Sequence, residues 1–289
     1  MKAIYYLLLA GSALSCEPRW NYDTEGYESE VVVEGWIEAG SYPRVLLSQS
    51  ISSSVTIDTT GWVDIPVYWA KVTVSDGEQT EVLTGRYDAN YLPPYTYTGS
   101  QIKGQPGKEY TLLIECSGRT VRAKTRIPEG NVSMRHIDVS RVAEKPGFYQ
   151  VEVSFYDDPA TKDYYKFFTR VHQSDLRYYS SQLGTIDDGV IANGSATVPV
   201  YKYVRNYTDK NGSQYFKPGD KLSVKITRIG REEFLFWNSY DNQLTNNKNP
   251  IFGNVSNLKS NIEGGTGIWC GYLTQEHHLM IWGEERIEF

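Results

Sequence analysis

The residues that could bind a metal are few and mostly scattered. His277 and His278 directly follow Glu276, and this triplet is the nearest approach to a metal-binding cluster in the 289-residue chain. The surrounding residues are typical of a strand, in which adjacent side chains point to opposite faces, so the two imidazoles do not readily share one ion. His136 and His172 have no neighbours at ligand spacing. We therefore predict no metal site and no cofactor, and interpret these histidines as strand residues.

Two aspartate clusters could supply paired carboxylates. Asp157-Asp158 and Asp187-Asp188-Gly189 could act in a glycosidase or as oxygen ligands for calcium. A glycosidase needs two carboxylates held across a cleft, which the sequence does not show, and a calcium loop needs acids at alternate positions, which neither cluster has. Because such residues are common in turns, we interpret both clusters as turn residues. No residue is assigned a catalytic role, and we predict that the protein is not an enzyme.

Cys16 has the clearest chemical role in the sequence. Lys2 and an apolar run at residues 4–10 precede it, and mostly small residues at positions 11–15 lead into it. The apolar run is too short to span a bilayer, which needs about 20 residues, and the pattern is typical of an export signal. We predict a signal peptide over residues 1–15 and lipid attachment at Cys16. The alternative is an ordinary secretory signal that leaves an incidental cysteine.

The four residues Ala13-Leu14-Ser15-Cys16 resemble the lipobox of bacterial lipoproteins. This resemblance implies that the mature chain begins at Cys16 and is held at a membrane by several acyl chains, of which two or more give stable attachment. Residues 16–28 contain Pro18 and Gly26 and show no sustained apolar period. We therefore predict that they form a flexible, lipidated tether.

The two remaining cysteines are Cys116 and Cys270, each inside a predicted strand. Export makes a disulfide between them chemically permissible. A free cysteine also behaves as a small apolar residue and is often buried. We favour two separate buried thiols, and the pairing stays open from the sequence.

An aromatic segment is the best candidate for a recognition loop. It contains two prolines, Pro93 and Pro94, and four tyrosines, Tyr87, Tyr91, Tyr95 and Tyr97. Rigid aromatic side chains offer contact area at a small cost in entropy, and loops often carry binding functions. The alternative is a hairpin edge whose rings pack on their own sandwich.

The composition favours a β fold with a substantial core. The chain contains 23 Tyr and 7 Trp, and 40% of its residues are hydrophobic, which is enough to bury a core at this length. The formal net charge is −6, and Lys and Arg do not cluster. Nucleic acid is therefore excluded as a partner, because phosphate contacts need clustered basic residues.

The order of strand-like segments predicts two β domains. Pro106-Gly107 forms a turn that delivers Tyr110 to the start of a strand, as in an immunoglobulin-like sandwich whose tyrosine hydroxyl ties down a corner. Residues 127–130 break the pattern. We predict an N-terminal β-sandwich over residues 29–129 and a C-terminal β-domain over residues 130–289, both immunoglobulin-like or related.

One segment of the second domain has helical spacing. Phe234, Trp237, Tyr240 or Asp241, and Leu244 recur at helical spacing, and Glu232 and Glu233 lie in the first turn, where the helix dipole favours acids. We predict one amphipathic helix near residues 231–244. Residues 173–195 are expected to be a long insertion with at most a short, irregular strand.

The most distinctive local sequence lies after this helix. Asn261, Gly264, Gly265 and Gly267 fit an Asn-x-x-Gly-Gly-x-Gly pattern that leads into an aromatic segment. Together with Cys16, the early strand and the helix, it makes the chain resemble a Bacteroidota outer-membrane lipoprotein family of unknown function. Members are often encoded beside TonB-dependent transporters. From the residues alone, the glycines indicate positive φ angles or a close backbone approach, and a phosphate cradle is disfavoured because extended residues follow.

These observations together predict a membrane-anchored lipoprotein. The resemblance implies a non-enzymatic accessory or ligand-binding component that works with a TonB-dependent outer-membrane transporter. The alternative is a fimbrial or adhesive surface subunit, and a carbohydrate-active enzyme is less favoured. The expected location is the outer membrane, through the lipid anchor, and the sequence leaves open which face of that membrane carries the protein.

Overall fold

A computed structural model describes residues 28–50, 66–191, 193–202, 213–246, 258–282 and 285–288. The predicted signal peptide, Cys16 and the tether up to residue 27 lie outside these ranges. The described chain is mainly β with one α-helix late in the chain, which confirms the predicted fold class. Within these ranges, no helix has the length and apolar character needed to cross a bilayer.

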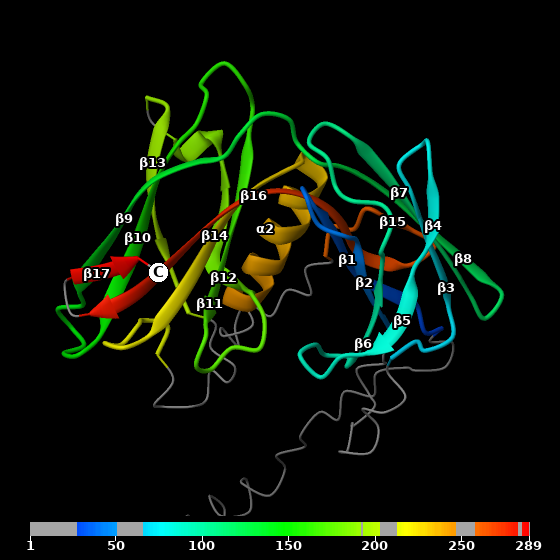
Figure 1. The fold of residues 1–289 in the computed structure, drawn as a ribbon, viewed down its shortest axis with the longest axis horizontal. Coiled ribbons are helices and arrows are strands. Elements are labelled where there is room, and N and C mark those ends of the chain that lie inside the picture. Colours follow the sequence, from blue (N-terminus) through cyan, green and yellow to red (C-terminus); the bar gives the residue numbers. More distant parts are fainter. Residues whose placement is uncertain are drawn as a thin grey trace, which may run out of the picture.

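A nine-stranded sheet runs through the molecule (Figure 1). The strand order is β12-β11-β14-β16-β1-β2-β6-β5, and β17 pairs with the far end of β16. The strands are β1 (Val31–Glu38), β2 (Arg44–Gln49), β5 (Thr84–Tyr87), β6 (Tyr95–Thr98), β11 (Tyr164–Val171), β12 (Tyr179–Asp187), β14 (Lys221–Ile229), β16 (Thr266–Trp282) and β17 (Glu285–Glu288).

The long strand β16 connects the two halves of this sheet. Its first half pairs in parallel with β1, from Val32↔Thr266 to Glu38↔Tyr272. Its second half pairs antiparallel with β14, from Arg228↔Leu273 to Lys221↔Met280. Residues near the end of the chain therefore complete a sheet that begins with the first described strand.

Two smaller sheets pack on one face of the large sheet. The first has the order β15-β8-β7-β3-β4, and the second has the order β13-β10-β9. Their strands are β3 (Lys71–Ser75), β4 (Thr80–Val82), β7 (Glu109–Cys116), β8 (Arg119–Arg126), β9 (Ser133–Arg141), β10 (Tyr149–Tyr156), β13 (Ser195–Val200) and β15 (Ile262–Glu263). Each small sheet closes a separate hydrophobic core against the large one.

Alternation along β16 shows that both cores lie on the same face of the large sheet. Trp269 belongs to the core of the first sandwich, and Leu279 and Ile281 belong to the core of the second. These residues are separated by even numbers of positions, and side chains in a strand alternate between faces with a period of two. The opposite face of the central strands is therefore left for other elements.

The helix α2 (Arg231–Asn246) covers part of this opposite face and confirms the predicted helix. The predicted Phe234 and Trp237 pack against this face and are partly buried, whereas Phe236, which the spacing did not single out, is buried. Two acids are also buried: Glu233 contacts Thr125, and Asp241 pairs with Lys166. The side chain of Leu244 lies outside the described ones. The spacing of apolar residues does not reveal that acids are buried on this face. These acids can be buried because polar side chains of the sheet bond to them.

The first sandwich includes strands from both sides of the predicted domain boundary at residue 129. The division into two domains stays a prediction. The first sandwich contains strands from residue 31 to residue 126, and also β15 and the first half of β16.

The segment expected to be an irregular insertion instead contains β12, a nine-residue strand at the edge of the large sheet. Leu183 in β12 has a φ of 56°, and the register with β11 shifts nearby. This irregularity hides the alternation that identifies a strand.

The glycine-rich stretch makes the turn from β15 into β16. Gly267 has a φ of 116°, and a Cβ atom there would lie 2.0 Å from the Val33 carbonyl oxygen. The Asn261 side chain closes the turn, because its Oδ1 accepts from the Trp269 backbone N–H at 2.9 Å and its Nδ2 donates to the Trp269 carbonyl at 2.8 Å. The predicted positive φ and close backbone approach are confirmed, and they explain the Asn-x-x-Gly-Gly-x-Gly pattern structurally.

Candidate functional site

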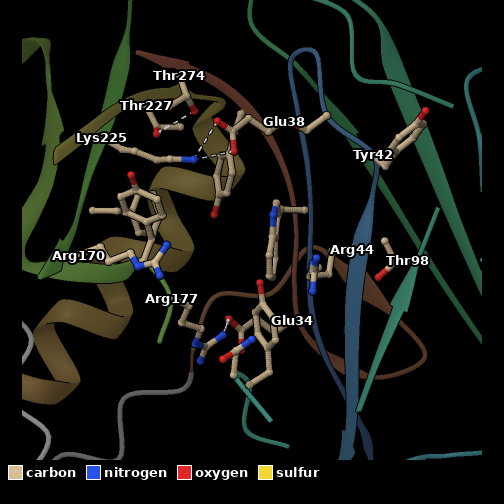
Figure 2. Close-up of a pocket in the computed structure, with 18 of the residues that line it drawn as sticks. Glu34, Glu38, Tyr42, Arg44, Thr98, Arg170, Arg177, Lys225, Thr227 and Thr274 are labelled. Atoms are coloured by element: carbon tan, nitrogen blue, oxygen red, sulfur yellow. Dashed lines mark hydrogen bonds and ion pairs between the residues drawn. The ribbon is translucent and has the colours of Figure 1, made fainter. Parts of the chain in front are cut away.

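A cavity of about 610 Å³ lies on the face of the large sheet that carries α2 (Figure 2). Strands β1, β11, β14 and β16 contribute to it, together with the 88–91 loop and the 172–178 segment. Its charged lining residues are Glu34, Glu38, Arg44, Asp88, Lys103, Arg170, Arg177 and Lys225. Its aromatic lining residues are Trp36, Tyr42, Tyr91, Phe168, Tyr178, Trp237 and Tyr272. A second cavity of about 310 Å³ shares Glu34, Arg177 and Trp237 with the first.

Strand alternation explains why β1 delivers charges to this cavity. Val33 and Ile37 are buried in the first core, whereas Glu34, Trp36 and Glu38 point to the other face and line the cavity. One strand thus serves a hydrophobic core with one face and a polar cavity with the other. The rigid sheet fixes the spacing of the two glutamates.

Three ion pairs link the walls of the cavity. Arg177 Nη1 lies 3.3 Å from Glu34 Oε1, and Arg44 Nη1 lies 3.1 Å from Asp88 Oδ2. Lys225 Nζ lies 3.1 Å from both carboxylate oxygens of Glu38. Each pair joins groups from different elements, so the walls are held by charge as well as by the sheet.

Tyr91 lies at the centre of a cluster of cations. The guanidinium carbons of Arg44 and Arg177 lie 4.8 Å and 4.9 Å from the centre of its ring. The Trp36 ring centre is 6.1 Å away. Burial raises the pKa of the Tyr91 hydroxyl, although the two neighbouring arginines act in the opposite direction. Tyr91 therefore stays neutral at physiological pH and offers its ring rather than a charge.

A hydrogen-bonded chain of side chains lies beside the cavity. Ser223 Oγ is 2.6 Å from both His172 Nε2 and His278 Nδ1, and Ser223 is fully buried. A hydroxyl has one proton, so Ser223 donates to one imidazole and accepts from the other. The Tyr178 hydroxyl, on the same face, donates to Glu276, which lies 3.6 Å from His278. Ser223 is too buried to act as a nucleophile. The hydrogen-bonded side chains instead position the cavity wall that carries Tyr178.

The paired histidines of the sequence separate as predicted. His278 contacts Ser223, whereas the His277 ring lies 3.4 Å from the Gln275 amide nitrogen. Among the residues that the structure describes, no three histidine, cysteine or acidic side chains gather in a way that could hold a metal ion. The meeting of His172 with His278 was not predicted, because it depends on the register of β14 with its two neighbours.

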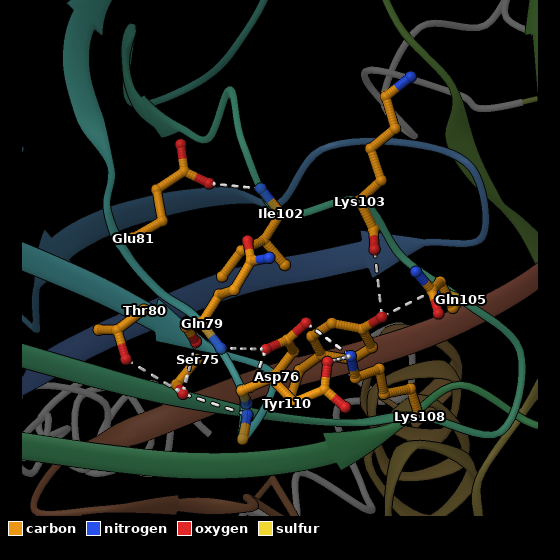
Figure 3. Close-up of polar contacts among 12 residues, drawn as sticks. Ser75, Asp76, Gln79, Thr80, Glu81, Ile102, Lys103, Gln105, Lys108 and Tyr110 are labelled. Atoms are coloured by element: carbon orange, nitrogen blue, oxygen red, sulfur yellow. Dashed lines mark hydrogen bonds and ion pairs between the residues drawn. The ribbon is translucent and has the colours of Figure 1, made fainter.

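The loop that carries Lys103 is held at two places (Figure 3). The Glu81 carboxylate accepts from the backbone N–H groups of Gln101 and Ile102. The Tyr110 hydroxyl donates to the Lys103 carbonyl at 3.2 Å and accepts from the Gln105 N–H at 2.8 Å. This confirms the predicted role of Tyr110 in tying down a corner. The clamp also fixes the backbone of a cavity-lining lysine.

Only one of the four predicted recognition tyrosines reaches the cavity. Tyr91 lines it, whereas Tyr87 is 71% exposed at the end of β5. Tyr95 packs edge-on against Tyr97, and the buried Tyr97 donates its hydroxyl to the Val67 carbonyl. Recognition by this segment stays a prediction, now centred on Tyr91.

The first aspartate cluster lies at a turn as predicted, whereas Asp187 ends β12 and caps the short 3₁₀-helix Asp188–Val190. Asp158 Oδ1 accepts from the Ala160 N–H, and Asp187 Oδ1 accepts from the Gly189 N–H. Asp157 is buried and accepts from the Tyr165 hydroxyl, and burial raises the pKa of this carboxyl. None of these carboxylates lines the cavities described here.

The two described cysteines are buried and free. Cys116 packs in the core of the first sandwich, and Cys270 packs under α2 on the opposite face of the large sheet. Burial raises the pKa of both thiols. The open question of their pairing is thus answered in favour of separate buried thiols.

Sequence reasoning missed most of the charged cavity residues. Arg170 and Lys225 come from β11 and β14, far from β1 in the sequence, and only the sheet order brings them together. A local signal exists in β1, where Glu34 and Glu38 interrupt a run of apolar residues at alternate positions. Such charges on one face of a central strand indicate that this face is not a hydrophobic core.

Comparison with known sequences identifies a family. No curated protein matches the chain. The profile of the family described as "Domain of unknown function (DUF4249)" matches residues 19–277. This match includes α2 and every residue that lines the larger cavity, and it ends within β16. The chain therefore belongs to the DUF4249 family.

Proposed function

We propose that this protein is a non-enzymatic, ligand-binding lipoprotein that is anchored through Cys16 and works with a TonB-dependent transporter at the outer membrane of a Bacteroidota cell. The observation that carries the binding role is the cavity of about 610 Å³ on the helix-bearing face of the sheet. Its size falls in the range of small-molecule sites, and it combines aromatic rings with a few fixed charges, as such sites do.

The arrangement of the cavity carboxylates supports binding rather than hydrolysis. Glu34 and Glu38 both project from one strand, β1, and therefore from one wall of the cavity. Glycosidases hold their two carboxyl groups on either side of the scissile bond. Each glutamate is also engaged in an ion pair within the cavity wall, Glu34 with Arg177 and Glu38 with Lys225.

The binding role is tested by the small molecules that copurify with the full chain. Thr274 lines the cavity on β16, so Thr274→Trp fills the space. Thr84 is exposed on the edge strand β5, so Thr84→Trp serves as the matched control. Mass spectrometry after denaturation should release a small molecule from the wild type and from the control, and none from Thr274→Trp. Equal release from all three proteins, or no release from the wild type, would refute the binding role.

The anchor and the partner are tested separately. Cys16→Ala should move the protein from the membrane fraction to the soluble fraction of the exported proteins. The wild type, purified intact from membranes, should bring a TonB-dependent transporter with it. Unchanged fractionation of Cys16→Ala would refute the anchor, and a purification without any transporter would refute the partnership.

A further inference from the structure

The larger cavity carries a surplus of positive charge. Five cations and three carboxylates line it, although the whole chain has a net charge of −6. The three carboxylates each pair with one cation, as described above for Arg44, Arg177 and Lys225. The other two cations, Arg170 and Lys103, form no ion pair with any carboxylate in the described ranges. Among the lining residues, the surplus is therefore two charges, on Arg170 and Lys103. The Glu276 carboxylate beside the cavity lies 3.8 Å from Lys225 and interacts electrostatically with Arg170, but forms no ion pair with it.

Arg170 is half-buried and lies on the β11 side of the cavity. Its Nε donates to the Asp175 carbonyl oxygen at 3.3 Å, which orients the side chain. The two terminal nitrogens remain, and their parallel N–H groups match the two oxygens of a carboxylate. Arg170 is therefore oriented so that its two terminal nitrogens can bind one carboxylate.

Lys103 supplies the second charge from another wall. Its Nζ lies 5.1 Å from the centre of the Tyr42 ring. In Figure 2, Tyr42 and Arg170 lie on opposite sides of the cavity. The backbone of Lys103 is fixed by Tyr110, and the side chain is exposed to solvent at the cavity. Two cations on opposite sides favour a ligand with an anionic group at each end.

Aromatic rings line the cavity in addition to the cations. Trp36 comes from β1, Phe168 from β11 and Tyr272 from β16. Such rings pack against the apolar faces of rings and of sugars, and contribute contact area without charge. The ligand that fits this lining has a ring-bearing body between its anionic ends.

We propose that the cavity binds an organic dianion with a carboxylate at each end and a ring-bearing body. Arg170 holds one carboxylate, and Lys103 holds the other. An oligosaccharide of uronic acids has this chemistry. The inference rests on the proposed binding function and adds the chemical class of the ligand.

The test is calorimetric titration of the full chain with three probes. Digalacturonate carries two carboxylates on a disaccharide body, cellobiose is a neutral disaccharide of similar size, and inorganic phosphate is an anion without a body. We expect digalacturonate to bind at least about tenfold more tightly than either of the others, since one charge-assisted contact contributes about a factor of ten. Its affinity should fall as the ionic strength rises.

Three variants locate the charges, and a fourth serves as a control. Arg170→Gln and Lys103→Gln should each weaken digalacturonate binding about tenfold. Lys103→Glu should weaken it further, and because Lys103 is exposed this variant retains the fold. Arg135 lies over the Tyr156 ring on the exposed surface of another sheet, so Arg135→Gln should bind like the wild type.

The outcomes separate this inference from the proposed function. If cellobiose binds as tightly as digalacturonate, or if the variants at Arg170 and Lys103 bind like the wild type, the assignment of a dianion is wrong. If neither sugar binds but a copurified molecule is released only from proteins with an open cavity, the dianion is again wrong and the binding function stands. If no probe binds and no molecule copurifies, both proposals fail.

Discussion

The guanidinium carbon of Arg177 lies 4.9 Å from the centre of the Tyr91 ring, while its Nη1 lies 3.3 Å from the Glu34 carboxylate. Tyr91 comes from a loop of the first sandwich, and Arg177 comes from the segment before β12 in the second. The contact therefore joins the two halves of the molecule at the cavity. It explains how a cavity built from distant strands keeps one shape.

The ring of Tyr91 should matter more than its hydroxyl. Tyr91→Phe keeps the contacts with both arginines, and ligand affinity should stay unchanged. Tyr91→Ala removes these contacts, each of which contributes about 0.5–1 kcal/mol at an exposed site, so affinity should fall roughly fivefold. Tyr87→Ala is the control, because Tyr87 is exposed and does not line the cavity. Titration with the copurified ligand measures all three, and a loss in Tyr91→Phe equal to that in Tyr91→Ala would contradict the role of the ring.

The clamp on the Lys103 loop should be measurable as local stability. Tyr110→Phe removes the hydrogen bonds to the Lys103 carbonyl and the Gln105 N–H but keeps the buried ring. The free energy of unfolding should fall by about 1–3 kcal/mol, because two partly buried hydrogen bonds are lost. Hydrogen exchange of residues 101–105 should accelerate while that of β16 stays slow. Uniform acceleration over the whole chain would show that the hydroxyl acts globally and not as a local clamp.

Gly267 should tolerate no side chain. Gly267→Ala places a Cβ atom 2.0 Å from the Val33 carbonyl oxygen at a positive φ, so the parallel pairing of β1 with β16 must shift. We expect a loss of at least about 3 kcal/mol in the free energy of unfolding. Gly77 also has a positive φ, but a Cβ there meets nothing within 4 Å. Gly77→Ala should therefore cost only about 1 kcal/mol, and chemical denaturation of both variants compares them. Equal losses would mean that the contact with Val33 is unimportant.

The glycine stretch shows what the sequence could predict. The positive φ angles, the corner role of Tyr110 and the helix near residues 231–244 follow from local spacing, and local geometry decides them. The parallel pairing of β1 with β16 joins residues more than 230 positions apart, and no local pattern encodes it. The cavity depends on that pairing, because it brings Glu34 beside Ile268 and, through β14 and β11, near Arg170. The sequence therefore gives no local signal that a single charged residue such as Arg170 belongs to a binding site.

The buried ion pair under α2 should be replaceable only as a pair. Lys166 is fully buried and its Nζ lies 3.0 Å from Asp241 Oδ2, with Thr185 Oγ1 bonded to both groups. Lys166→Met leaves the buried carboxylate without its cation and should cost about 3–5 kcal/mol in the free energy of unfolding. The double variant Lys166→Met/Asp241→Leu should recover most of this loss. Denaturant unfolding of both variants decides the matter, and a double variant as unstable as the single one would contradict the pairing.

The same lysine predicts a pH dependence. Burial lowers the pKa of Lys166 from 10.5 to about 8, although Asp241 acts in the opposite direction. Between these two values the unfolded chain binds more protons than the folded chain, so the contribution of Lys166 to stability rises with pH from about 8 to 10.5. The double variant lacks this contribution. The difference in unfolding free energy between wild type and double variant should therefore grow in favour of the wild type over that range, and a constant difference would contradict the lowered pKa.

The most direct test of the binding cavity is equilibrium titration of the copurified small molecule back into the purified full chain. The wild type and Thr84→Trp should bind one molecule per chain with the same affinity, and Thr274→Trp, whose added ring fills the cavity, should show no saturable binding. Saturable binding of equal affinity by Thr274→Trp would contradict the assignment of the cavity as the site.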